Sequence, residues 1–327
     1  MELINSTYLT DKVVEDDNFC YRQPIEKNVK YRIRSCVSVL YDWFYKLLFF
    51  LFAKKAESRK YEISICAIFK NEAPFLKEWL EFHLMLGIDH FYLYNNNSED
   101  DYLDVLKPYI DCGKVTLTEW PENPGQISSY KHFYNTYREE TRWVSFLDLD
   151  EFICPKLVTS LKVWIQKYAK YPVVLIYWKM FGTSGKMHHD YNKTVTEQYT
   201  VSWPKLYNVG KLFYNTQYDI SDFPLGMMHE ISVKFLGLHI PPINIFGKFV
   251  KYGIHRANGK GFDIQVNHYW SKAYDAYEAK HSRGDAAFGV SPRNYDYFIS
   301  HEVRNTSSDY TIMRFVVQLK QQLRRKI

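Results

Sequence analysis

The feature that most constrains this chain is the regular alternation of short apolar runs with amphipathic segments after residue 60. Runs rich in β-branched and aromatic residues predict buried strands, and apolar residues at helical spacing predict helices. Strands that alternate with helices at this spacing are typical of parallel strands joined by crossovers. We therefore expect an α/β fold with an open, mostly parallel, Rossmann-like sheet, helices on both faces and an elaborated C-terminal half. The expected strands are 63–69, 89–94, 114–119, 143–149 and 173–178, and the expected helices are 74–86, 102–109 and 126–137.

The 327 residues divide into three expected parts. Residues 1–60 form an N-terminal arm that includes a hydrophobic helix. Residues 61–290 form the α/β domain, and residues 291–327 form a helical tail. The two later helical stretches should cover 274–280 and 310–322.

Composition excludes some classes of protein. The 42 Lys and Arg exceed the 37 Asp and Glu by only five, without a long basic stripe, so we expect no nucleic-acid partner. The five cysteines are scattered and form no CxxC pair, which argues against a disulfide framework or a zinc knuckle and favours a reducing compartment. The many aromatic residues suit sugar stacking, membrane interfaces and bulky cores alike.

The segment 37–53 (VSVLYDWFYKLLFFLFA) raises the question of a membrane. It falls just short of a spanning helix, and Asp42 and Lys46 add an insertion cost that their pairing only softens. A helix lying in the interface, with its aromatic residues among the acyl chains and basic flanks at anionic headgroups, has no such cost. We therefore expect a protein peripheral to the cytoplasmic face of a membrane. A helix packed on the domain and a single-pass anchor remain alternatives.

The strongest candidate site is Asp148-Leu149-Asp150-Glu151, which follows the apolar run ending the fourth expected strand. In an extended chain residues i and i+2 face the same side, so Asp148 and Asp150 should converge and be exposed at the strand end. Open α/β sheets bind ligands beyond the carboxyl ends of their strands. Two carboxylates there suit Mg²⁺ or Mn²⁺ bridging a pyrophosphate. Since an Asp-x-Asp also occurs by chance, the alternative is a pair of solvated acids.

Several motifs in order along 62–285 resemble glycosyltransferase family 92 and its bacterial relatives, which are similar to family 2 in having a glycosyltransferase A fold. The motifs lie in the same order as in the family and at plausible spacings, so together they are more specific than any single one. They are Phe69-Lys70-Asn71-Glu72, Glu78-Trp79 with Glu81 and His83, GIDHFYLY at 87–94, DLDEF at 148–152, FGTSG at 181–185, NHYWSK at 267–272, Lys280 and Arg283-Gly284.

The resemblance implies a metal-dependent enzyme that moves a sugar from a nucleotide-sugar, usually a UDP-sugar, to a glycan or lipid-linked acceptor with inversion. It implies that Asp148, Asp150 and His268 are the metal site, with Asp148 also facing the ribose of the donor. Taken alone, a residue such as His268 is more often a core histidine, and the family match makes the two interpretations about equal. A bound cation would stabilise the charge that grows on the departing diphosphate. Surface polysaccharide or glycoconjugate assembly is the expected setting.

The residues expected to contact the donor lie where the first strands end and where the helix at 126–137 begins. Family members often carry Asp at the position of Asn95, which leaves the selection of uridine open. At Gln126, Tyr130 and Lys131 a solvated helix start is an equal alternative to phosphate contact. The expected donor-binding residues are Ala67, Phe69, Asn71, Glu72, Asn95, Asn97, Gln126, Tyr130 and Asp148.

Inversion requires a base that takes the proton of the acceptor hydroxyl. We favour Glu230 over Asp222 and Asp190, although an exposed loop acid is the commoner explanation for such a residue. The rival function is a catalytically silent glycan-binding or assembly protein. A nucleotidyltransferase is less favoured because the chain lacks an early Gly-rich phosphate loop. The donor sugar, the acceptor and the oligomeric state stay open.

Overall fold

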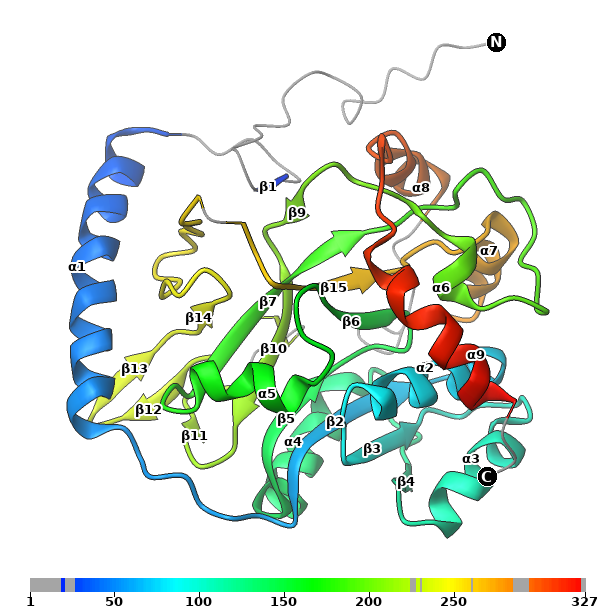
Figure 1. Cartoon of the computed structure of the whole chain (residues 1–327), viewed down its shortest axis with the longest axis horizontal. Coiled ribbons are helices and arrows are strands. Elements are labelled where there is room, and N and C mark those ends of the chain that lie inside the picture. The colour runs from blue at the N-terminus through cyan, green and yellow to red at the C-terminus, as the bar shows by residue number, and fades with distance from the viewer. Residues whose placement is uncertain are drawn as a thin grey trace.

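A mixed sheet forms the centre of the protein (Figure 1). The computed structural model describes residues 19–20, 27–223, 228–229, 231–259, 261–284 and 294–324. The strands of the central sheet are β2 (Tyr61–Phe69), β3 (His90–Asn95), β4 (Val115–Glu119), β5 (Thr141–Phe146), β6 (Glu151–Pro155), β7 (Val173–Met180), β10 (Gly210–Asn215), β14 (Ile243–Asn244) and β15 (Ile264–His268).

Short strands and helices surround this sheet. The smaller sheets pair β1 (Phe19–Cys20) with β9 (Leu206–Tyr207), β8 (Val201–Ser202) with β16 (Ser307–Ser308), and β12 (Val233–Phe235) with both β11 (Asp219–Ile220) and β13 (Leu238–Ile240). The helices are α1 (Val29–Phe52), α2 (Ala73–Met85), α3 (Tyr102–Asp111), α4 (Gln126–Thr136), α5 (Leu161–Ile165), α6 (Val195–Gln198), α7 (Tyr274–Ser282), α8 (Tyr295–Glu302) and α9 (Val316–Leu323), with 3-10 turns η1 (Arg138–Glu140), η2 (Gln166–Tyr168) and η3 (Thr311–Phe315).

The order of strands in the central sheet is β4-β3-β2-β5-β10-β7-β15-β6, and β14 also pairs with β7. The first four strands are parallel, whereas β10 is antiparallel to both neighbours and β6 is antiparallel to β15. The connection from β4 to β5 passes back across β2 and β3, so right-handed crossovers put α4 on the face opposite to α2 and α3. The predicted α/β fold with an open, mostly parallel sheet is confirmed.

Local sequence explains these elements. In β2 the residues from Ile63 to Phe69 are all buried, as expected for a strand covered on both faces. Pro74 occupies the first turn of α2, where its missing N–H costs nothing, and Gly87 follows the helix with φ at 95°. Trp79, Leu80 and Phe82 of α2 are buried in the core.

The helix α1 is longer than predicted and begins at Val29 rather than at residue 37, because the side chain of Asn28 caps it by accepting the N–H of Tyr31. Figure 1 shows α1 along one side of the molecule, near β12 and β13. One face, including Asp42, Tyr45 and Phe49, is buried. The structure thus packs part of this helix on the domain.

Candidate functional site

The two acids of the Asp-x-Asp motif lie in a turn and not at the end of a strand. β5 ends at Phe146, and β6 begins at Glu151, whose N–H donates to the carbonyl of Asp148 (3.1 Å). The predicted strand end at residue 149 is therefore wrong. The prediction that both acids are exposed is wrong for Asp150, whose side chain is 2% exposed, whereas that of Asp148 is 32% exposed.

A buried lysine lies beneath this turn. Lys211 of β10 places Nζ 2.8 Å from Asp148 Oδ2 and 3.3 Å from Glu151 Oε2, and its side chain is 4% exposed. Glu151 Oε2 also accepts the N–H of Asp148 at 2.9 Å. Because an ammonium in the interior must be paired, Lys211 ties the turn to the antiparallel strand that β10 adds to the sheet.

His268 lies at the end of β15, in register with Glu151 of β6. Its Nε2 is 3.6 Å from Asp150 Oδ1, and its Nδ1 is 4.0 Å from Glu151 Oε1. Neither Nδ1 nor Glu151 Oε1 has a hydrogen-bond partner in the part of the chain that the structure describes. The imidazole therefore has one nitrogen toward Asp150 and the other toward a buried carboxyl, the orientation that a carboxylate gives a metal-binding histidine.

Three more basic side chains reach this site from residues 272–283, which include α7. Lys280 pairs with Asp150 Oδ2, and Arg283 pairs with Glu72 Oε1. Lys272 Nζ lies 3.9 Å from Glu72 Oε2, an oxygen without a hydrogen-bond partner among the described residues. Positive charge thus converges where α2 begins and where the turn after β5 lies.

These contacts set the charges of the acids. Burial opposes the ionisation of Asp148, but Lys211 outweighs it and holds the pKa of this carboxyl below its usual range. At Asp150 burial is likewise outweighed by Lys280 and His268, and the pKa lies well below its usual range. Burial raises the pKa of Glu151 well above its usual range despite Lys211. The turn therefore contains two ionised carboxylates beside one that holds its proton more tightly.

Besides Asp148, three of the residues predicted to bind the donor lie near the turn. Gln126, the first residue of α4, donates from Nε2 to Asp148 Oδ1 at 3.3 Å, and its Oε1 has no partner among the described residues. Tyr130 is fully buried one turn later, where its ring packs on Phe146 (centroids 4.7 Å apart). Glu72 joins the same site through Arg283.

The other predicted donor residues are placed differently. Asn71, at φ 51°, accepts from Arg283 through its carbonyl, while Asn95 donates to Glu119 Oε2 at 2.6 Å and Asn97 to the carbonyl of Pro121 at 3.1 Å. Asn95 thus ends β3 and Asn97 follows it, both beside the end of β4. Ala67 and Phe69 are buried within β2, so only their backbone could contact a ligand.

The two candidate bases that the structure describes, Asp222 and Asp190, are not assembled with the acids. Glu230 lies outside the described residues. Asp222 is exposed, and Asp190 lies in a loop where its carboxylate accepts from the N–H and side chain of Asn192 and pairs with Lys193. None of the contacts made by Asp222 or Asp190 among the described residues involves Asp150.

Sequence reasoning gave no role to the aromatic residues beside His268. Trp178 of β7 packs against His268 (centroids 4.6 Å apart) and against His229 (4.7 Å), and it stacks on Tyr207 (6.1 Å). Its buried Nε1 has no partner among the described residues. Burial lowers the pKa of His229 to about 3, so this ring is neutral. Trp178 lies in a hydrophobic run, and nothing in that run indicates that its ring packs beside His268.

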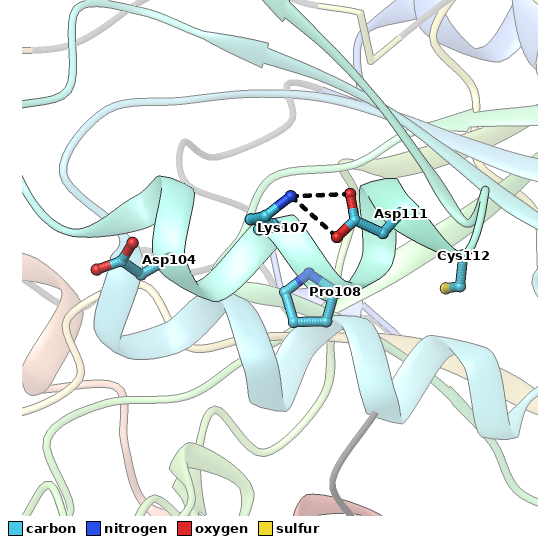
Figure 2. Close-up of a pocket in the computed structure, with 5 residues that line it drawn as sticks. All are labelled: Asp104, Lys107, Pro108, Asp111 and Cys112. Atoms are coloured by element: carbon cyan, nitrogen blue, oxygen red, sulfur yellow. Dashed lines mark hydrogen bonds and ion pairs between the residues drawn. The ribbon is translucent and has the colours of Figure 1, made fainter.

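A hollow elsewhere on the surface is separate from this site. It measures about 530 Å³ and is lined by residues of α3 and its cap (Figure 2). Figure 2 shows Lys107 paired with Asp111, one turn further along the same helix, at this hollow. We assign no function to it.

Asp150 and His268 fit a divalent cation of the kind that the family resemblance implies. They offer an oxygen and a nitrogen donor side by side, although no three His, Cys, Asp or Glu side chains are grouped as a metal site in the described part of the chain. A hard cation in a nucleotide site commonly takes one or two protein ligands and completes its shell with phosphate oxygens and water. Asp148 is turned toward Lys211 and is not part of this pair.

The open, mostly parallel α/β sheet is the fold that the motifs predicted. The model of glycosyltransferase family 92 matches residues 59–218 of this chain, which confirms the resemblance that the motifs predicted. A glycosyltransferase family 92 protein of Ricinus communis is 25% identical over 242 residues, which cover 72% of this chain and 40% of that protein.

Two further similarities are more partial. A galactan β-1,4-galactosyltransferase of Arabidopsis thaliana is 25% identical over 158 residues, covering 43% of this chain and 31% of that enzyme. The chain thus spans less than half the length of these relatives. The crystal structure of S. aureus TarS in complex with UDP is 16% identical, with a TM-score of 0.32 over 47% of each chain. A structural similarity at this level supports no conclusion beyond the strand order described above.

Proposed function

We propose that this protein is a metal-dependent glycosyltransferase that moves a sugar from a nucleotide-sugar, most simply a UDP-sugar, to a glycan or lipid-linked acceptor with inversion, in the assembly of surface polysaccharide or glycoconjugate. The observation that carries this proposal is the contact of Asp150, which lies in the turn after β5 and within the segment matched by family 92, with both His268 and Lys280. The galactosyltransferase named among its relatives is consistent with it.

The residues have distinct roles in this proposal. Asp150 and His268 would hold a Mn²⁺ or Mg²⁺ ion, which supplies neutralising charge for the departing diphosphate. Asp148, held by Lys211 and Gln126, would face the ribose of the donor and the metal side. Glu230 is our proposed base for the acceptor hydroxyl, with Asp222 and Asp190 as the other candidates.

The test is the release of the nucleotide, a nucleoside diphosphate from UDP-, GDP- and dTDP-sugars or CMP from CMP-sugars, with Mn²⁺ or with EDTA. We expect release from one donor class only with the metal ion. Asp150→Asn should reduce it by about a hundredfold to a thousandfold, the scale of losing one main electrostatic contact in the transition state. Asp104→Asn, the same chemical change at an exposed position of α3, is the control and should retain the wild-type rate.

Activity of Asp150→Asn equal to that of the wild type would refute the assignment. Binding of glycan by the wild type that is indifferent to EDTA, without any release of diphosphate, would instead favour the rival binding protein.

We further propose that α1 holds the protein at the cytoplasmic face of a membrane. By length and composition α1 could cross a bilayer. Its inner face is fixed to the domain, however: Asp42 is 3% exposed and accepts the N–H of Phe249 at 2.9 Å. On the outer face Trp43 is 73% and Phe50 is 75% exposed. This two-sided pattern favours a helix that lies in the interface, because spanning would strip Asp42 of its partner.

Sedimentation with vesicles tests this placement. The wild type should bind vesicles that contain phosphatidylserine more tightly than neutral ones, since Lys30, Arg32 and Lys54 flank the apolar face and are exposed. Replacing Trp43 and Phe50 by Ser should abolish binding without unfolding the domain. Binding that survives this change, or that resists extraction at high salt and high pH as a spanning helix does, would contradict the interfacial placement.

A further inference from the structure

Asp150 has two different kinds of partner on its two oxygens. Oδ1 faces the imidazole of His268 at 3.6 Å, while Oδ2 is paired with the ammonium of Lys280. The side chain of Asp150 is 2% exposed and that of Lys280 is 22% exposed, so the lysine is the partner with access to solvent. A tethered cation therefore occupies one oxygen of the carboxylate that would bind a metal ion.

A metal ion and the ammonium cannot both be satisfied by this carboxylate alone. Two cations that share one carboxylate repel each other, and in a buried site water screens that repulsion poorly. Lys272 and Arg283 add further positive charge nearby, and Glu72 is the acid that balances them. A second anion is therefore needed before a divalent cation can enter without a net loss.

The diphosphate of a nucleotide-sugar is such an anion. Lys280 lies in the last turn of α7, and its four-carbon side chain can swing through several ångströms while the helix stays in place. Arg283 and Lys272 lie beside it and would face the same phosphates. Displacing the ammonium from Asp150 thus costs little when a diphosphate is present to receive it.

We propose that Lys280 is an exchangeable cation, paired with Asp150 in the unliganded protein and transferred to the diphosphate of the donor when a divalent cation takes its place. This inference rests on the proposed function and deepens it. It makes the binding of metal and donor cooperative, since each removes the obstacle to the other. Lys280 would then also contact the leaving group.

The experiment measures two affinities that do not depend on turnover. Binding of Mn²⁺ without nucleotide is followed by electron paramagnetic resonance, and binding of UDP at saturating Mn²⁺ by calorimetry. For Lys280→Gln we expect Mn²⁺ to bind about tenfold more tightly and UDP about tenfold more weakly than in the wild type, the scale of one ion pair in a partly buried site. Lys280→Arg should behave like the wild type, as should His281→Gln, an exposed neighbour on α7.

Unchanged affinities in Lys280→Gln, or a change in only one of the two, would overturn the exchange. We expect equal thermal unfolding of all variants, because Lys280 is partly exposed. Equal unfolding would exclude misfolding as the cause of a changed affinity. Failure of the proposed function looks different: the wild type would then bind no UDP with Mn²⁺, or Asp150→Asn would leave Mn²⁺ binding unchanged. Metal-dependent UDP binding by the wild type, with an indifferent Lys280→Gln, overturns the exchange alone.

Discussion

Replacing Lys211 by Met should destabilise the protein because it leaves two acids without their shared cation. Nζ lies 2.8 Å from Asp148 and 3.3 Å from Glu151, and Glu151 is completely buried. Breaking one side of a buried ion pair costs about 3–5 kcal/mol. Asp148 is about a third exposed, so water can solvate it in part, and Glu151 can take up a proton. We therefore expect the low end of that range, about 3 kcal/mol.

The assay is urea unfolding at about pH 5.5 and at about pH 8. Without Lys211 the pKa values of both carboxyls rise, so the deficit of the variant should be smaller at the lower pH, where protonation removes the uncompensated charge. Adding Glu151→Gln to Lys211→Met should restore part of the lost free energy at about pH 8, because the buried carboxyl can then no longer ionise.

Lys179→Met is the matched control. Lys179 is a buried lysine of the neighbouring strand β7, and it donates to the carbonyl of Trp203. Its replacement should cost less and should show little dependence on pH in the same interval. A Lys211→Met variant within about 1 kcal/mol of the wild type at the higher pH, or with a deficit that ignores pH, would refute the pairing described above.

Two further changes test other parts of the structure. Burial raises the pKa of Glu78 to about 7, against hydrogen bonds from Val195 and Thr196, so the stability that this group contributes is present below about pH 4.5 and is lost as the pH rises through about 7. Glu78→Gln should remove up to about 3 kcal/mol of that pH dependence, measured by urea unfolding across the interval; identical pH profiles would contradict it. Asp42→Ala leaves the N–H of Phe249 unpaired and should cost about 1–3 kcal/mol, with faster proteolysis between α1 and the domain; an unchanged digestion rate would show that α1 is held by other contacts.

The first half of the sheet could be predicted because its strands and helices are continuous local patterns. The bounds of β2, β3, β4 and α2 lie within a few residues of those expected from periodicity alone. The motif acids were found for the same reason, since they directly follow an apolar run. Their burial could not be predicted, because it depends on Lys280 and His268, which lie more than a hundred residues further along the chain.

Lys211 illustrates what local patterns leave out. It lies in the run GKLFYN, where a lysine beside apolar residues looks like the solvent-facing side of a strand. Only the insertion of β10 between β5 and β7 turns it inward, and that pairing joins segments about seventy residues apart. The sheet therefore defines a charge network that no short window of sequence contains.

The balance of charge in this network bears on how a donor could bind. Without His268, the four acids and four basic residues of this network sum to zero charge when Glu151 is ionised. They sum to one positive charge when Glu151 is protonated, the form that burial favours by raising its pKa. A divalent cation alone would add two positive charges to it, and a diphosphate alone would add negative charge beside Asp148 and Asp150. Together they nearly cancel, so the site favours arrival of both over either one. The network consists of four acids and four basic residues: Glu72, Asp148, Asp150, Glu151, Lys211, Lys272, Lys280 and Arg283.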